Sequence, residues 1–181
     1  MSVPFKDAAE LDAGGTAAFL RIVPDGGVSR GALFQVNARG APVEFTYNRL
    51  DVPSGALWRP EQLERESAKA LAVSLFEAAR RTPLVLLCLA DEVDAALFRE
   101  DLEVQIPVCR VAIVEEGGRL EASVSEQVVL GDVTAHLFWR PGVPSVESPP
   151  RRLVTALAGR GLLLEPFERA LAGLEEAFSG A

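Results

Sequence analysis

Apolar residues recur at two different spacings along this chain, and the spacing shows where strands give way to helices. Between residues 16 and 50, three short apolar runs are separated by turn sequences rich in glycine, proline and asparagine. In the third run apolar and polar residues alternate, which places Val43, Phe45 and Tyr47 on one side of a strand. The pattern predicts three antiparallel strands over residues 16–23, 31–37 and 43–50, with one face of the third in water.

A helical spacing begins at Pro60, which is a favourable residue at a first helical position, and continues to about Arg81. Leu63, Leu71, Leu75 and Ala78 recur at this spacing and predict the buried face. Pro83 ends the helix, and residues 84–90 form a continuous apolar run of the kind found in strands covered on both faces.

The rest of the chain predicts a parallel pair followed by a hairpin and two helices. A short helix over residues 93–102 and a covered strand over 108–114 complete a βαβ unit. Gly117 and Gly118 predict a turn, strands follow over 120–128 and 133–139, and helices follow over 149–160 and 166–178. We therefore predict an α/β protein with α+β character, built on a single mixed sheet. Residues 1–15 form a flexible lead-in, 16–181 one domain, and 149–181 its C-terminal helical pair.

Composition restricts the classes of function. The 181 residues carry a net charge of −8 and give a pI near 4.8, which disfavours binding that depends on broad neutralisation of nucleic-acid phosphates. The sequence contains no apolar run long enough to span a membrane, and residues 1–16 lack the pattern of a secretory signal. Cys88 and Cys109 lie in apolar strands without metal-site spacing. We expect a cytoplasmic protein with reduced core thiols, no metal, no cofactor and no membrane contact.

The element order resembles the ribonuclease H fold over about the first two thirds of the chain. That resemblance implies an acid from the first strand, one from the long helix and one from the end of the next strand, which together bind metal ions. Asp91 fits the third place and Glu64 the second. The first place is empty, since residues 16–23 contain no carboxylate. The simpler interpretation makes Glu64 a carboxylate in the first turns of a helix, and Asp91 a helix cap.

A second candidate site is a serine motif. Gly27-Val28-Ser29-Arg30-Gly31 matches G-x-S-x-G, and Asp91 and His136 follow in the order that α/β-hydrolases use. That mechanism needs the serine on a strand-to-helix turn, whereas this motif lies in a predicted hairpin, where glycine and serine are ordinary turn residues.

A third candidate is a binding surface. Tyr47, Asn48 and Arg49, followed by Trp58 and Arg59, gather aromatic and arginine side chains near one end of the predicted sheet. These residue types are common at binding hot spots, although Trp58 could simply staple the start of the helix. The last helix carries an apolar stripe that could be core or could dock on a partner.

Three functions stay open on the sequence. The main prediction is a non-enzymatic accessory or protein-interaction protein that binds a protein partner or a second copy of itself. The alternatives are a metal-dependent nuclease or phosphatase of ribonuclease H-like fold that uses Glu64 and Asp91, and a serine hydrolase that uses Ser29.

Overall fold

The structure is a computed structural model, and it describes residues 15–52, 58–113 and 126–179. Seven strands form one mixed sheet in the order β3-β2-β1-β4-β5-β7-β6. The strands are β1 (Ala17–Asp25), β2 (Val28–Val36), β3 (Pro42–Asp51), β4 (Val85–Leu89), β5 (Val108–Ile113), β6 (Glu126–Leu130) and β7 (Val133–Arg140). The helices are α2 (Pro60–Ala78), a π-helical turn η1 (Leu97–Asp101), α3 (Pro149–Gly159) and α4 (Glu165–Phe178).

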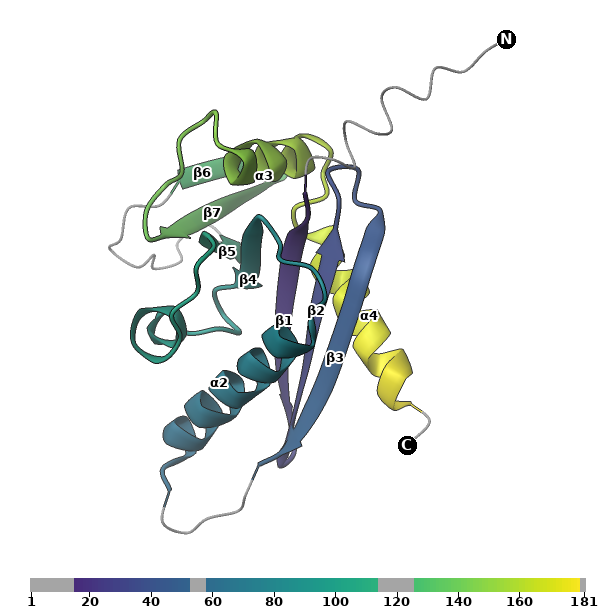
Figure 1. Cartoon of the computed structure of the whole chain (residues 1–181), viewed down its shortest axis with the longest axis vertical. Coiled ribbons are helices and arrows are strands. Elements are labelled where there is room, and N and C mark those ends of the chain that lie inside the picture. Colours follow the sequence, from purple (N-terminus) through teal and green to yellow (C-terminus); the bar gives the residue numbers. More distant parts are fainter. Residues whose placement is uncertain (1–14, 53–57, 114–125, 180–181) are drawn as a thin grey trace.

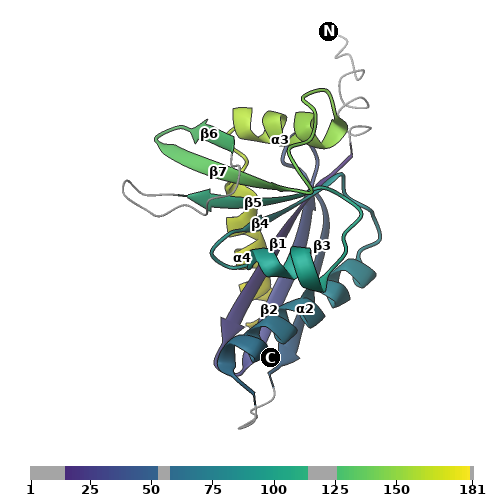
Figure 2. The same ribbon diagram turned by 90° about the vertical axis from the view of Figure 1, so that its left-hand side faces the viewer.

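The predicted mixed sheet is confirmed. β1, β2 and β3 form the antiparallel meander, β4 runs parallel to both β1 and β5, and β6 and β7 form the hairpin. Helix α2 lies on one face of the sheet and α4 on the other (Figure 1). The fold is therefore an α+β arrangement of one sheet with helices on both faces (Figure 2).

The alternation of side chains in β1 divides the core into two clusters. Ala18, Leu20 and Ile22 face α2 and pack with its Leu71 and Leu75. Ala17 and Phe19 face α3 and α4 on the other side. Phe19 meets Phe167 of α4 edge to face, with ring centroids 4.9 Å apart. The apolar stripe of the last helix is therefore largely core, and α4 packs on the sheet.

Two boundaries differ from the sequence prediction because tertiary contacts override local propensity. Helix α2 ends at Ala78, not Arg81, since the Glu44 carboxylate accepts hydrogen bonds from the backbone N–H groups of Arg80 and Arg81 (2.7 and 3.2 Å). The helix expected over residues 93–102 is shorter and is the π-helical turn η1. Of the expected buried face of α2, Leu71 and Leu75 are buried but Ala78 is exposed.

The C-terminal part of the sheet also differs from the prediction. The sequence placed a strand at residues 120–128 directly after the Gly117-Gly118 turn, but β7 is the strand that pairs with β5, and β6 lies outside it. Five consecutive residues of β7, Ala135 to Trp139, are buried, whereas β6 is only partly covered, as suits an edge strand. The Gly117-Gly118 turn, residues 120–125 of the predicted strand and residues 1–14 of the lead-in lie outside the described residues. Within the described residues, no helix is long and apolar enough to cross a membrane.

Gly31 sets the distance between β2 and α2. A Cβ atom added there would lie 2.0 Å from a Leu71 side-chain carbon. We expect Gly31→Ala to destabilise the protein by about 1–3 kcal/mol, because the fully buried Leu71 side chain, or the helix that carries it, must shift to relieve the overlap. Urea denaturation measures this, and Gly142→Ala is the matched control because no atom lies near its added Cβ. An unchanged unfolding midpoint for Gly31→Ala would contradict this packing.

Candidate functional site

The sheet and α2 together build a cavity rich in carboxylates, which we call the acidic cavity. β3 and β1 run in the same direction, because each is antiparallel to β2, and β4 is parallel to β1. Helix α2 follows β3 in the chain and therefore begins at the carboxyl edge of β1 and β4. The cavity lies there, with a volume of about 560 Å³. Its charged lining consists of Glu61, Glu64 and Arg65 from α2, Asp91, Glu92 and Asp94 from the segment after β4, and Arg110 from β5.

Glu64 and Asp91, the two acids selected from the sequence, line this same cavity. Glu64 reaches it from the first turns of α2 and Asp91 from the turn that follows β4, and both side chains are exposed. Asp91 is not the cap of the following turn, because Asp94 accepts the Ala96 N–H (2.6 Å). Asp94 therefore provides the side-chain hydrogen bond at the start of this turn.

The first strand brings an arginine, Arg21, to Glu92, one of the acids that line the acidic cavity. Arg21 of β1 donates from Nε and Nη2 to the two carboxylate oxygens of Glu92 (2.7 and 2.5 Å) and from Nη1 to the Phe167 carbonyl (3.0 Å). Both side chains of the ion pair are largely buried. Burial raises the pKa of the Glu92 carboxyl above its usual range, and the hydrogen bonds from Arg21 offset part of the rise.

A second arginine fixes the segment that carries Asp91. Arg110, a buried charged residue in β5, donates from Nε to the Val93 carbonyl and from Nη2 to the Ala90 carbonyl, both at 3.0 Å. These two bonds bracket Asp91 and Glu92 and hold their backbone against the sheet. Arg65 of α2 is tied to Asp101 and Glu100 of η1, which closes the other side of the cavity.

Sequence reasoning missed Arg21, Glu92 and Arg110. Their signal was present, since Arg21 and Arg110 are charged residues inside apolar strand runs, where an arginine is buried only with partners.

The donor set of the acidic cavity suits a hard divalent cation, because carboxylate oxygens are the ligands that Mg²⁺ and Mn²⁺ prefer. Five carboxylates face two guanidinium groups in the lining, so the cavity is electronegative. Among the residues that the structure describes, no three His, Cys, Asp or Glu side chains lie close enough together to hold one ion. The arrangement therefore fits a cation with two protein carboxylates and retained waters, which is a common way to bind Mg²⁺.

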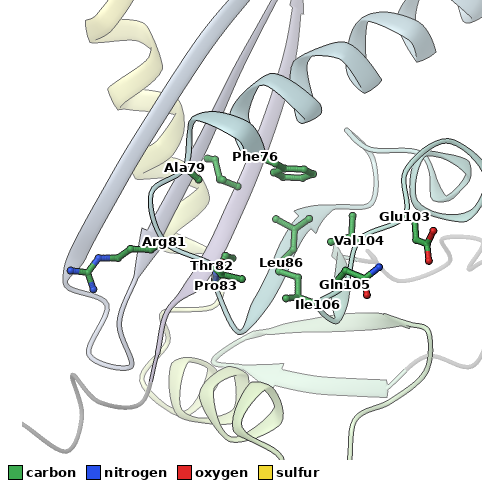
Figure 3. Close-up of a pocket in the computed structure, with 11 residues that line it drawn as sticks. Phe76, Ala79, Arg81, Thr82, Pro83, Leu86, Glu103, Val104, Gln105 and Ile106 are labelled. Carbon is green, nitrogen blue, oxygen red and sulfur yellow. The ribbon is translucent and has the colours of Figure 1, made fainter.

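A second, smaller cavity lies at the other end of α2 and is mainly apolar. Its volume is about 260 Å³, and Phe76, Leu86, Val104 and Ile106 form its wall. Figure 3 shows these side chains facing one another, while Arg81 points away from them. Among the described residues, its charged lining consists of Glu103 and Arg81.

The serine-hydrolase hypothesis is wrong on geometry. Ser29 is buried inside β2 and His136 inside β7, and three strands lie between β2 and β7. At ordinary strand spacing the two residues are about 19 Å apart across the sheet. Ser29 also lies in a strand and pairs with Leu50 and Pro24, so it occupies no strand-to-helix turn.

The two thiols are core residues, as expected. Cys88 and Cys109 are free and buried, and they belong to opposite faces of the sheet. Burial raises the pKa of Cys88 to about 12 and that of Cys109 well above its usual value. We expect neither thiol to react with iodoacetamide in the native protein at pH 8, and both to react in denaturant, as mass spectrometry would show. Modification of either thiol under native conditions would contradict the buried placement.

The five residues of the predicted binding surface separate in the structure. Tyr47 and Arg49 share the face of β3 toward α4, whereas Asn48 turns to α2 and donates to the Ser74 hydroxyl (3.0 Å). Trp58 and Arg59 lie at the start of α2, and Trp58 is 55% exposed. Arg49 lies over the ring of Phe178. Whether these residues bind a partner stays a prediction.

Comparison with known proteins identifies the fold. No protein-family model matches the sequence, and no curated protein matches it. Among solved structures, Endonuclease V from Streptomyces avermitilis matches with a TM-score of 0.63 at 13% identity, over 99% of this chain and 95% of that one. Endonuclease V from Bacillus subtilis matches with a TM-score of 0.52 at 15% identity, over 93% and 82%.

A protein of unknown function from Archaeoglobus fulgidus matches with a TM-score of 0.50 at 15% identity, over 90% of this chain and 98% of that one. The chain therefore has an Endonuclease V-like fold, which is a ribonuclease H-like fold, and the fold prediction is confirmed.

These neighbours correct the main functional prediction. A non-enzymatic interaction protein was expected because no complete catalytic set was readable in the sequence. Two of the similar structures are named as endonucleases, and the match spans nearly the whole chain. The nuclease alternative fits this better, and the non-enzymatic prediction is wrong. Its error was to weigh the missing first-strand carboxylate above Glu64 and Asp91, which line one cavity.

Proposed function

We propose that the protein hydrolyses phosphodiester bonds in nucleic acid, in the acidic cavity and with a divalent cation. The observation that carries the proposal is that Glu64 of α2 and Asp91 after β4 line one cavity. These are the two elements from which the ribonuclease H resemblance draws acids. The similarity in fold to structures named Endonuclease V supports nucleic acid as the substrate class.

Electrostatics support a cation in this site. A phosphodiester is an anion, and an unneutralised cavity lined by Glu61, Glu64, Asp91, Glu92 and Asp94 would repel it. A bound divalent cation supplies the missing positive charge, acidifies a bound water and stabilises charge on the phosphoryl oxygens. This proposal replaces the sequence-based expectation that the protein uses no metal.

The residues of the chain have separate tasks in this reaction. Glu64 and Asp91 are the groups that would hold the cation. Arg110 keeps the backbone around Asp91 in place through the Ala90 and Val93 carbonyls. The oxygen of a water molecule bonds to phosphorus, the P–O ester bond breaks, and the departing oxygen takes up a proton, while the water's proton leaves to solvent.

The site departs from the ribonuclease H pattern at β1, because no residue of this strand lines the acidic cavity. The carboxylate of β1, Asp25, lies at the exposed end of the strand, where it pairs with Arg30 and does not line the acidic cavity. Glu92 is bound to Arg21, so the cavity keeps Glu64 and Asp91 for one cation. We therefore propose a site for a single cation.

A cleavage assay tests this function. Labelled single-stranded and duplex DNA and RNA are incubated with the purified protein and Mg²⁺ or Mn²⁺, with EDTA as the control. Cation-dependent cleavage of at least one substrate is expected. No cleavage of any of them, with the protein shown to be folded, would refute the proposal.

A further inference from the structure

A groove beside β3 carries aromatic and arginine side chains that the proposed reaction does not use. β3 is an edge strand of the sheet, and Figure 1 shows it between α2 and α4. Residues 43–47 of β3, with Ala78, Arg80 and Arg81, line a groove of about 730 Å³. We call it the Tyr47 groove.

Tyr47 is the aromatic group that this groove offers to a ligand. Half of its surface is exposed, at 50%, which is unusual for an aromatic side chain with neighbouring rings available to cover it. Phe45 and Phe178 contact it from two directions, with ring centroids 5.8 and 5.6 Å away. These contacts hold the ring in a fixed orientation, so a stacking partner would order it at little cost in entropy.

Two arginines line the same groove as this ring. Arg80 and Arg81 line the groove with exposed side chains, and Arg49 stands two residues from Tyr47 on the same face of β3. None of the ion pairs found within the described residues uses Arg49, Arg80 or Arg81.

Among the described residues that line the groove, Glu44 is the one carboxylate, and it is already engaged. Glu44 accepts the backbone N–H groups of Arg80 and Arg81 and also a hydrogen bond from Gln35 (3.3 Å). The groove is therefore positive on a chain whose net charge is −8. Because salt screens charges over about 10 Å, this local excess governs a ligand in the groove more than the distant acids do.

A planar aromatic ring beside exposed guanidinium groups is the arrangement that binds single-stranded nucleic acid. Bases stack on the ring whatever their sequence, and the arginines contact the phosphates. We propose that the Tyr47 groove binds single-stranded nucleic acid outside the catalytic site, with Tyr47 stacking on a base and Arg80 and Arg81 contacting the backbone. This deepens the proposed function and rests on it for the choice of ligand.

The position of the groove fits a strand that continues toward the acidic cavity. Glu64 and Ala78 lie fourteen residues apart on α2, which corresponds to about 21 Å along the helix. A single strand that occupies both the groove and the cation site would span at least this distance, so a shorter substrate would contact only one of the two.

Binding without cleavage tests the groove separately from the reaction. Fluorescence anisotropy of a labelled oligothymidylate is measured in EDTA, where the proposed reaction is off. Tyr47→Ala is expected to raise Kd about tenfold, whereas Tyr47→Phe keeps the ring and should bind like the wild type. Arg80→Ala and Arg81→Ala should each lower the slope of log K against log salt by about 0.7. Arg99→Ala, an exposed arginine in η1, is the control and should change neither.

Each outcome decides the proposal. Equal Kd values for Tyr47→Ala and the wild type, or no binding by the wild type, would overturn it. A Tyr47→Phe variant as weak as Tyr47→Ala would also overturn stacking. If the oligonucleotide binds as described but no substrate is ever cleaved, the groove stands and the proposed hydrolysis falls. If cleavage occurs and the Tyr47 variants bind normally, the proposed hydrolysis stands and the groove falls.

Discussion

Replacing Glu64 with Gln and Asp91 with Asn together is expected to lower the rate of phosphodiester hydrolysis roughly 100- to 1,000-fold. Both substitutions keep the shape of the side chain and remove the charge that would hold the cation. Loss of metal catalysis costs several kcal/mol of transition-state stabilisation, and each 1.4 kcal/mol is a factor of ten. The measurement is the initial rate of cleavage at saturating Mg²⁺ or Mn²⁺.

Glu66→Gln is the matched control for this loss. Glu66 is exposed on the same helix but does not line the acidic cavity. It should cleave at the wild-type rate, and all of these variants should melt close to the wild type because their side chains are exposed. A double variant that keeps the wild-type rate would remove Glu64 and Asp91 from the reaction.

Replacing Arg21 with Ala is expected to give the largest loss of stability among single charge changes, roughly 2–4 kcal/mol. The guanidinium makes three hydrogen bonds that join β1, the segment after β4, and α4. Removing it leaves the Glu92 carboxylate partly buried without its partner. The cost of an unpaired buried charge exceeds the stability that the ion pair had contributed. Equilibrium denaturation in urea measures the loss.

The loss should depend on pH in a fixed direction. Burial already raises the pKa of Glu92 in the folded state, and without Arg21 it should rise further. A carboxyl whose folded pKa lies above its unfolded value destabilises the fold as pH rises through that interval. The Arg21→Ala deficit should therefore be smaller at pH 5 than at pH 8, and adding Glu92→Gln should recover part of it. A deficit that is equal at both pH values and unaffected by Glu92→Gln would contradict the ion pair.

The arrangement of the first five strands could be predicted from the sequence because each of them carries a local signal. The alternation at residues 43–50 marked β3, and the covered runs at 84–90 and 108–114 marked the central parallel pair. The prediction of a face in water was wrong for β3, because Glu44 and Asn48 on that face are half-buried and bond to Arg80, Arg81 and Ser74. The place of β7 beside β5 could not be predicted, because strand order there depends on pairing between distant segments. Burial of Ala135 to Trp139 decides that order, and burial becomes visible only in the fold.

The candidate site was half predictable. Helical spacing and the end of a strand suffice to bring Glu64 and Asp91 to one edge of the sheet. The ion pair of Arg21 with Glu92 joins residues 71 apart in sequence, and the clamp of Arg110 joins residues 17 and 20 apart. No local pattern reports such pairs. Likewise, the Tyr47 groove forms because α2 ends before Arg80, and the backbone N–H groups of Arg80 and Arg81 bond to Glu44 instead. This is a tertiary contact.

Calorimetric titration with Mn²⁺ tests the central claim most directly, because it does not depend on the choice of nucleic-acid substrate. The account predicts one saturable site per chain in the wild type, and no saturable binding in the Glu64→Gln, Asp91→Asn double variant. Absence of binding in the wild type, or the same binding isotherm in both proteins, would contradict a cation site in the acidic cavity.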